Sequence, residues 1–165
     1  MGYNKTHMKR LRLYLDTTVW NFAFAEDAPD YQKDTLELFA KVRQGLFDIY
    51  VSDAVLNELR DAPEPRQGQV SALLEELKPV VLDTSLEIDR LAAVYLAKGV
   101  LPQKSTADAV HIAYATVYEM DYLLSWNFRH LANPKRRAKV SALNVDEGYR
   151  FPMVIVTPLE VLDVE

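Results

Sequence analysis

Residues 11–18 read LRLYLDTT, a short apolar segment that ends at an acid and two threonines. Residues 11–15 have the length and composition of a buried strand. Similar segments recur along the chain, separated by stretches with helical periodicity: FDIYV (47–51), PVVL (79–82), YLL (122–124) and MVIV (153–156). Short apolar strands that alternate with helices are typical of βαβ units. The sequence therefore predicts an α/β fold, a three-layer α/β/α doubly wound arrangement with a mostly parallel sheet of about five strands.

The composition is that of an ordinary globular domain. The chain has 165 residues, of which 49% are hydrophobic and 26% charged. We expect one domain over residues 11–165, preceded by an N-terminal extension over residues 1–10. Met8 is an alternative natural start, in which case residues 1–7 are an addition.

Three features of the composition exclude whole classes of protein. The absence of cysteine excludes disulfides, thiol catalysis and thiolate metal sites. No apolar run approaches the roughly 20 residues of a membrane helix, so we expect a cytoplasmic protein without membrane contact. The net charge is −5, and a phosphate-containing partner would therefore need a local basic patch.

Polar residues follow the predicted strands at the end where doubly wound folds bind their ligands. Asp16 directly follows residues 11–15, Glu58 lies in the helix after residues 47–51, Asp108 opens a helix, and Asn127 follows residues 122–124. Glu58 borders the apolar stripe of its helix and should be half-buried. Carboxylates in such a position need a partner, and a divalent cation is one. The spacing predicts that the three acids and the amide converge.

Each of these residues also has an ordinary structural explanation. Asp16 can cap a helix, and Glu58 can pair with a nearby arginine. Asp108 together with Ser105 fits a helix-capping pattern. His111, one turn after Asp108, is more often a core histidine with satisfied hydrogen bonds, and otherwise would donate toward Asp108.

Other catalytic motifs are absent from the sequence. It contains no glycine-rich phosphate loop, no H-E-x-x-H, no G-x-S-x-G and no histidine cluster. Carboxylate chemistry with a hard cation remains.

The chain resembles the PIN-domain (PilT N-terminus) ribonucleases, and more closely the VapC-like toxins of bacterial and archaeal toxin–antitoxin pairs. The resemblance extends over nearly the whole chain. It rests on LYLDTTVW around Asp16, VSDAVLNEL around Glu58, STADAVHIAYA around Asp108, DYLLSWNFRHL around Asn127, and a terminal VTPLEVL.

This resemblance implies a site and an activity. The acidic metal site of the family falls on Asp16, Glu58 and Asp108, with Asn127 where many members have an aspartate. It implies a catalytic set of these four residues, one or two Mg²⁺ or Mn²⁺ ions, and hydrolysis of RNA phosphodiester bonds. Thr17 and Thr18 would place the phosphate or a metal-bound water, or cap the helix. The asparagine removes one negative charge and leaves the number of metal ions open.

The resemblance also implies partners: an RNA substrate, a small antitoxin protein and a second copy in a homodimer. Five basic residues without an intervening acid form the best candidate for phosphate contact: Arg129, Lys135, Arg136, Arg137 and Lys139. The alternative is a solvated helix face. Trp126 and Phe128 would stack on bases, but beside a buried strand they more often belong to the core.

Two other functions compete with a toxin nuclease. One is a housekeeping RNA-processing nuclease, and the other is a PIN-like binding or scaffold module without catalysis. A dehalogenase-like phosphatase also has an acid after its first strand, but it needs a second aspartate where this chain has Thr18.

Overall fold

The computed structural model describes residues 9–163, and it contains one parallel sheet between two layers of helices. The strand order is β3-β2-β1-β4-β5, with every neighbouring pair parallel. The strands are β1 (Leu11–Leu15), β2 (Phe47–Ser52), β3 (Val80–Leu82), β4 (Tyr122–Leu124) and β5 (Val154–Val156). The predicted doubly wound α/β fold is confirmed. The predicted extension over residues 1–10 lies outside the described residues except for Lys9 and Arg10.

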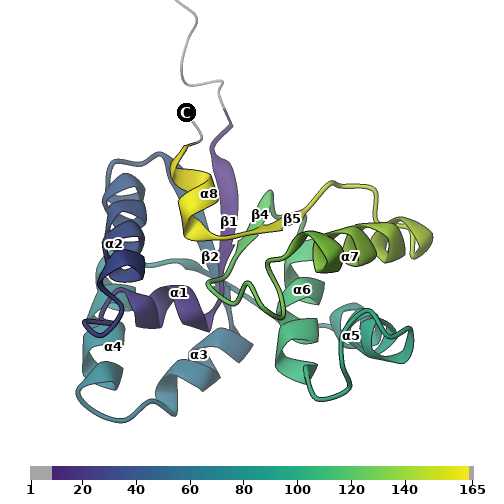
Figure 1. The fold of residues 1–165 in the computed structure, drawn as a ribbon, viewed down its shortest axis with the longest axis horizontal. Helices are drawn as coiled ribbons and strands as arrows, with labels where there is room; N and C mark the ends of the chain where they lie inside the picture. Colours follow the sequence, from purple (N-terminus) through teal and green to yellow (C-terminus); the bar gives the residue numbers. More distant parts are fainter. Residues whose placement is uncertain (1–8, 164–165) are drawn as a thin grey trace, which may run out of the picture.

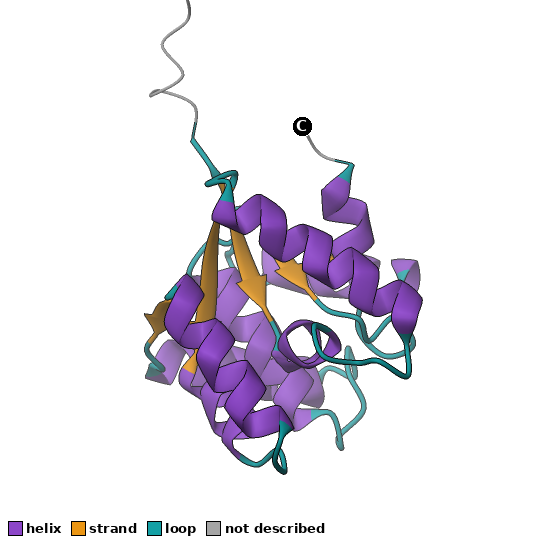
Figure 2. Ribbon diagram, turned by 90° about the vertical axis from the view of Figure 1, so that its left-hand side faces the viewer, coloured by secondary structure: helices purple, strands orange, loops and turns teal. Residues whose placement is uncertain are grey.

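The helices connect the strands in the order that crossover connections require. They are α1 (Thr17–Phe22), α2 (Pro29–Arg43), α3 (Asp53–Arg60), α4 (Arg66–Leu77), α5 (Leu86–Ala97), α6 (Thr106–Val117), α7 (Pro134–Asp146) and α8 (Pro158–Leu162). In Figure 1, α1 to α4 lie on one side of the sheet and α5 to α7 on the other. Figure 2 shows the strands between these layers. None of the helices in residues 9–163 is long and apolar enough to cross a bilayer.

Strand β1 is the centre of the sheet and of the core. Leu13, Tyr14 and Leu15 are each 0% exposed. Burial on both faces is what a central parallel strand requires, and it explains the unbroken apolar character of this segment. The carboxyl end of β1 is therefore held firmly beside the carboxyl end of β4, with Asp16 N donating to Leu124 O at 3.1 Å.

Short polar side chains set the beginnings of several helices. The hydroxyl of Ser52 accepts from Val55 N at the start of α3, and Asn133 Oδ1 accepts from Arg136 N at the start of α7, where Pro134 takes the first helical position. Gly45, at φ +78°, ends α2 in a backbone conformation that favours glycine. Ser105 differs from the sequence prediction, because its side chain does not cap α6.

Hydrophobic periodicity predicts neither α1 nor α8. Both are too short to show a helical repeat: α1 has 6 residues and α8 has 5. Their signals are instead at their caps. Asp16 caps α1, and Thr157 with Glu160 forms a capping box around Pro158 at the start of α8.

Candidate metal and phosphate site

Asp16 lies at the topological switch point of the sheet, where β1 and β4 lead to opposite layers. Its Oδ1 accepts from Thr18 Oγ1 at 2.5 Å, Thr18 N at 3.0 Å and Val19 N at 3.4 Å. These contacts confirm the helix cap and orient the carboxylate. Burial raises the pKa of Asp16 above its usual value, although the charge of His111 and hydrogen bonds from Ser125, Thr18 and Val19 oppose the shift.

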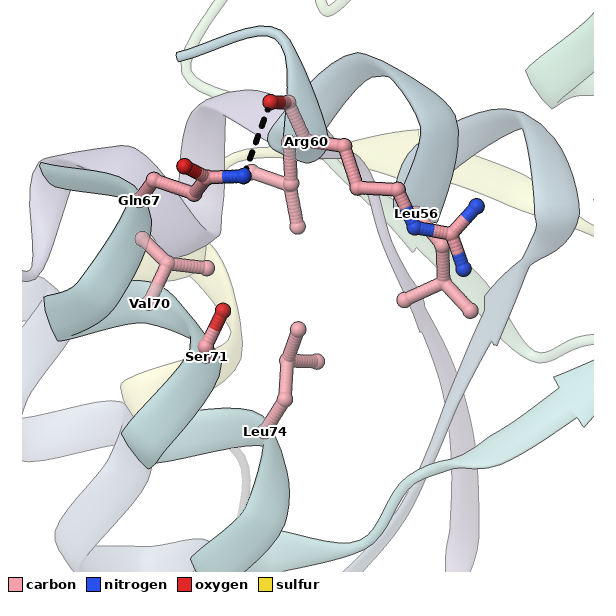
Figure 3. A pocket seen from close by; sticks show the side chains of 7 residues that line it. Leu56, Arg60, Gln67, Val70, Ser71 and Leu74 are labelled. Atoms are coloured by element: carbon pink, nitrogen blue, oxygen red, sulfur yellow. Dashed lines mark hydrogen bonds between the residues drawn. The ribbon is translucent and has the colours of Figure 1, made fainter. Parts of the chain in front are cut away.

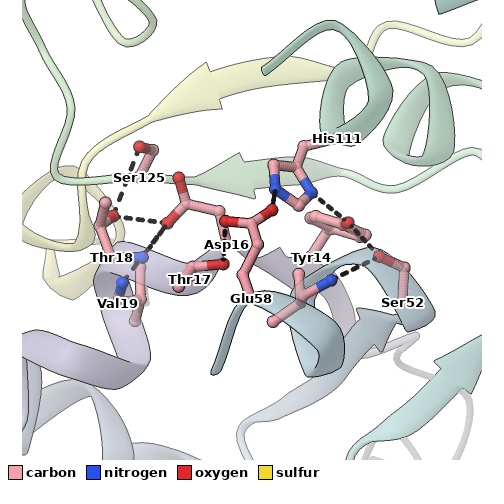
Figure 4. A network of polar contacts seen from close by, with 10 residues as sticks. Tyr14, Asp16, Thr17, Thr18, Val19, Ser52, Glu58, His111 and Ser125 are labelled. Atoms are coloured by element: carbon pink, nitrogen blue, oxygen red, sulfur yellow. Dashed lines mark hydrogen bonds and ion pairs between the residues drawn. The ribbon is translucent and has the colours of Figure 1, made fainter. Parts of the chain in front are cut away.

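Glu58 reaches the same edge of the sheet from α3. Its Oε2 accepts from Thr17 Oγ1 at 2.8 Å, and its Oε1 lies 2.7 Å from Nε2 of His111 (Figure 4). The side chain is 39% exposed, as its place beside the apolar stripe predicts. Burial acts to raise the pKa of Glu58, but the hydrogen bond and charge of His111 and the hydroxyl of Thr17 bring it below the usual value. The partner of Glu58 is therefore a histidine and not an arginine.

His111 is the buried end of a polar chain that continues into the sheet. Its Nδ1 lies 2.8 Å from Tyr14 Oη, which lies 2.7 Å from Ser52 Oγ. Because the carboxylate of Glu58 needs a donor, we assign the proton to Nε2, and Nδ1 then accepts from Tyr14. Ser52 Oγ also accepts from Val55 N, which connects the chain to the start of α3.

The interpretation of His111 as a core histidine with satisfied hydrogen bonds is confirmed, because the residue is 2% exposed and both ring nitrogens have partners. The alternative, a hydrogen bond toward Asp108, is wrong, because the imidazole pairs with Glu58 and Tyr14. One helical turn places His111 and Asp108 on one face of α6. Tyr14 of β1 lies on the core side of that face, and its hydroxyl binds the imidazole there.

Asp108, in the first turn of α6, is half-buried beside this network. Burial raises its pKa, and the charge of Glu58 raises it further, whereas the charges of His111, His130 and Arg136 lower it. His111, one helical turn after Asp108 on α6, lies 2.7 Å from Glu58, so the start of α6 and α3 meet at this edge of the sheet. Burial disfavours the ionised form of this carboxyl group, and a bound cation would stabilise that form.

Asn127 follows β4, beside the end of β1, and its hydrogen bonds are to residues of its own turn. Its backbone N donates to Ser125 Oγ at 3.0 Å, and its Oδ1 accepts from His130 N at 3.1 Å. Ser125 joins the two positions, because its Oγ also lies 3.5 Å from Thr18 Oγ1, which donates to Asp16 Oδ1. The amide oxygen of Asn127 thus stabilises the turn after β4.

The carboxylates are near one another without forming a closed coordination sphere. Among residues 9–163, no three His, Asp or Glu side chains are arranged to hold one metal ion together. The donors are the hard oxygen ligands that Mg²⁺ and Mn²⁺ prefer, and two of them have pKa values raised by burial. The chemistry of the donor set fits such an ion, although a shared ion would have to draw the three carboxylates closer than they are here.

Comparison with known proteins finds similarity to solved structures but none to family models or curated sequences. No family model and no curated protein sequence matches the chain. A chain of the crystal structure described as VapBC2 from Rickettsia felis bound to a DNA fragment from their promoter aligns with a TM-score of 0.55 at 17% identity. The alignment covers 89% of this chain and 98% of that one. The chain has a PIN-like fold.

Within this PIN-like fold, the basic segment divides into two groups. Arg129, Lys135 and Lys139 are exposed. Arg136 is half-buried and its Nη1 donates to the carbonyl of Val100, and Arg137 pairs with Glu160 of α8 at 3.1 Å. The exposed group can contact the phosphates of a ligand. Arg136 and Arg137 instead connect the start of α7 to Val100 and to α8.

The PIN-like fold also has a surface hollow whose lining includes none of Asp16, Glu58 and Asp108. It has a volume of about 220 Å³ and is lined by residues of α3 and α4: Leu56, Leu59, Arg60, Gln67, Val70, Ser71 and Leu74. Figure 3 shows Gln67 donating to the carbonyl of Arg60 across its rim. Glu58 is not among the lining residues, so this hollow is distinct from the candidate metal site.

Sequence reasoning did not identify Tyr14, Ser52 or Ser125 as members of the site. Tyr14 sits in an apolar strand, where a core role is expected, and a serine at a strand end is typical of a helix cap. Only Ser125, which follows β4 as Asp16 follows β1, carried a positional signal. Trp126 is 6% exposed, as its place beside a buried strand predicts, but Phe128 is 43% exposed and is not part of the core.

Proposed function

We propose that this protein is a Mg²⁺- or Mn²⁺-dependent endoribonuclease. The observation that supports the proposal is the pair of contacts around Glu58. Its carboxylate lies 2.8 Å from the hydroxyl of Thr17, the residue after Asp16, and 2.7 Å from Nε2 of His111, one helical turn after Asp108. The three acids come from the end of β1, from α3 and from the start of α6. Acids from three separate elements at the switch point support a ligand site, since a capping role explains Asp16 alone.

Asp16, Glu58 and Asp108 would hold the cation. When bound, it would orient a water for attack and stabilise negative charge on the scissile phosphate. The donors around the acids define what the chain itself contributes. Thr18 and the first amides of α1 fix Asp16, while Thr17 and His111 fix Glu58.

RNA would reach the acids across the exposed basic residues Arg129, Lys135 and Lys139. Such contacts attract the backbone through counterion release and do not depend on base sequence. They compensate locally for the net charge of −5.

The test is cleavage of a panel of structured and unstructured RNAs by purified protein. We expect cleavage with Mn²⁺ or Mg²⁺, none with EDTA, and a rate at least about a hundredfold lower for Asp108→Asn. Asp89→Asn is the matched control, because Asp89 occupies the first turn of α5 as Asp108 occupies that of α6. Equal cleavage by the wild type and the Asp108→Asn variant would remove the nuclease proposal and leave the binding or scaffold module.

The partners follow from the resemblance to VapC-like toxins together with the likeness to the VapBC2 structure. We propose a small antitoxin-like protein as inhibitor and a homodimer as the assembled form. Inhibition of cleavage by the product of a small adjoining reading frame would separate a toxin from a housekeeping nuclease. Light scattering of the purified chain measures the assembly.

A further inference from the structure

Two exposed aromatic rings lie together near the candidate metal site. Among the large hydrophobic residues exposed in the described part of the chain, the aromatic ones are Tyr31 at 39% and Phe128 at 43%. Tyr31 is in α2 and Phe128 follows β4, yet their ring centroids are 5.8 Å apart with an interplanar angle of 49°. Exposed aromatic rings are uncommon, and two that meet from distant segments require an explanation.

The two rings are held in place by a buried third. The ring centroids of Tyr31 and Trp126 are 4.9 Å apart, and those of Phe128 and Trp126, which meet edge to face, are 6.3 Å apart. Trp126 Nε1 donates to Thr35 Oγ1 at 2.8 Å, and that hydroxyl donates to the carbonyl of Tyr31 at 2.6 Å. Rings fixed in this way lose little conformational entropy when a planar group packs on them.

The same tryptophan connects the rings to the acids. Trp126 N donates to Thr18 Oγ1 at 2.9 Å, and Thr18 Oγ1 donates to Asp16 Oδ1 at 2.5 Å. Phe128 directly follows Asn127 in the chain. Two hydrogen bonds through one hydroxyl therefore join the aromatic cluster to the carboxylate at the end of β1.

We propose that Tyr31 and Phe128 form a stacking subsite for an unpaired base of the RNA, a proposal that rests on the proposed function. Aromatic faces take any base, so the subsite selects single-stranded RNA and not a sequence. The charges in the segments that carry the rings favour one side for the phosphate backbone of the RNA. Asp30 in the first turn of α2 and Asp27 just before that helix, both exposed, would repel phosphates, whereas Arg129 would attract them beside Phe128.

The bound nucleotide would then place its base on the rings and its backbone over the loop after β4. This loop leads from Asn127 toward the exposed residues Arg129 and Lys135. A base anchored there is adjacent to the phosphate that the acids would address. A base-paired strand cannot offer its face to the rings, so the protein should discriminate against duplex RNA.

Binding without cleavage tests the proposal. Fluorescence anisotropy in EDTA would compare a labelled single-stranded oligonucleotide of about eight nucleotides, within the usual range for such sites, with the same strand in a duplex. We expect Phe128→Ala and Tyr31→Ala to weaken single-strand binding roughly tenfold, and Phe128→Leu to weaken it nearly as much, because leucine keeps the apolar volume but has no ring face. Tyr31→Phe should bind like wild type.

Two controls separate stacking from other effects. Leu36→Ala removes another exposed apolar side chain of α2, 46% exposed, and should leave binding unchanged. The aromatic variants should also keep the slope of binding against salt, because they touch no phosphate. Circular dichroism should confirm that each variant is folded.

Four outcomes decide between the possibilities. Wild-type affinity in Phe128→Leu and Tyr31→Ala overturns the stacking subsite, whether or not the protein cleaves RNA. Equal affinity for single strand and duplex overturns it as well. A dimer that dissociates in Phe128→Ala, with RNA binding unchanged, assigns the rings to a protein interface and overturns it. Loss of single-strand binding in these variants by a protein that cleaves no RNA with Mn²⁺ supports the subsite and removes only the nuclease.

Discussion

Nε2 of His111 lies 2.7 Å from Oε1 of Glu58, and this contact joins α6 to α3 across the candidate metal site. The histidine side chain is 3% exposed whereas the glutamate side chain is 39% exposed. A buried donor thus holds the orientation of a carboxylate that is open to solvent. This places His111 as a positioning residue, with Tyr14 fixing the ring from the other side.

The first prediction concerns the strength of this contact. A double-mutant cycle of Glu58→Gln and His111→Asn should give a coupling of about 0.5–1.5 kcal/mol in urea unfolding, modest because solvent screens the exposed glutamate. The pKa of Glu58 is lowered, so its contribution to stability is present above the usual glutamate pKa and is lost as pH falls through the folded value. Coupling that persists unchanged at about pH 2, below the usual glutamate range, would contradict a hydrogen bond that depends on the ionised carboxylate.

The second prediction concerns the charge of Asp108 in metal-free protein. Burial raises its pKa, so the folded chain keeps the proton to a higher pH than the unfolded chain. Stability therefore falls as pH rises from the usual aspartate pKa through the raised one. We expect Asp108→Asn to raise the Tm at neutral pH in EDTA by about 2–4 °C, the shift that roughly 1 kcal/mol produces in a domain of this size.

The gain in Asp108→Asn should disappear below about pH 3, where the aspartate of the wild type is also neutral. Asp89→Asn, also in the first turn of its helix, α5, is exposed and should show no such gain. A destabilised Asp108→Asn at neutral pH would mean that the carboxylate has a favourable partner in the folded protein.

Much of this arrangement could be predicted from the sequence. Short apolar segments between helical repeats define the parallel sheet, and an acid directly after β1 falls at the switch point because parallel strands end at one edge. The partner of His111 could not be predicted, since helical spacing places it on the face of Asp108 but does not show that Tyr14 comes from β1 to meet it. The contact of Tyr31 with Phe128 joins segments distant in the chain, and no local pattern carries such pairing.

The third prediction concerns the metal ion. If the carboxylates bind Mn²⁺ or Mg²⁺, the ion stabilises the folded state in proportion to its occupancy, by about 2.7 kcal/mol at one hundred times the dissociation constant. Thermal unfolding with increasing Mn²⁺ measures this shift. The variant Asp16→Asn plus Asp108→Asn should lose most of it, while asparagine at position 16 keeps an oxygen to cap α1. An equal shift in both proteins would place the ion elsewhere.

The fourth prediction concerns the buried hydroxyl of Tyr14. Tyr14→Phe leaves Ser52 Oγ and His111 Nδ1 without their common partner in the core. The expected cost is about 1–3 kcal/mol of unfolding free energy. Tyr50→Phe removes a half-buried hydroxyl that accepts from Arg12 Nε at 3.2 Å, and it should cost less because water can replace the tyrosine. A cost for Tyr14→Phe no greater than that of Tyr50→Phe would argue against the polar chain.

The last prediction separates the two groups of basic residues. Arg129 and Lys135 are exposed, so replacing both with alanine should leave the Tm unchanged while lowering the slope of RNA binding against salt by about 1 for each phosphate that the protein no longer neutralises. Arg136 is half-buried, donates to the carbonyl of Val100, and its charge opposes the raised pKa of Asp108. Arg136→Ala should therefore lower the Tm and, by removing a positive charge near the acid, shift the pKa of Asp108 further upward. A double variant that loses stability while Arg136→Ala alters only the salt slope would reverse the assignment, placing the phosphate contact on the residue that here supports the fold.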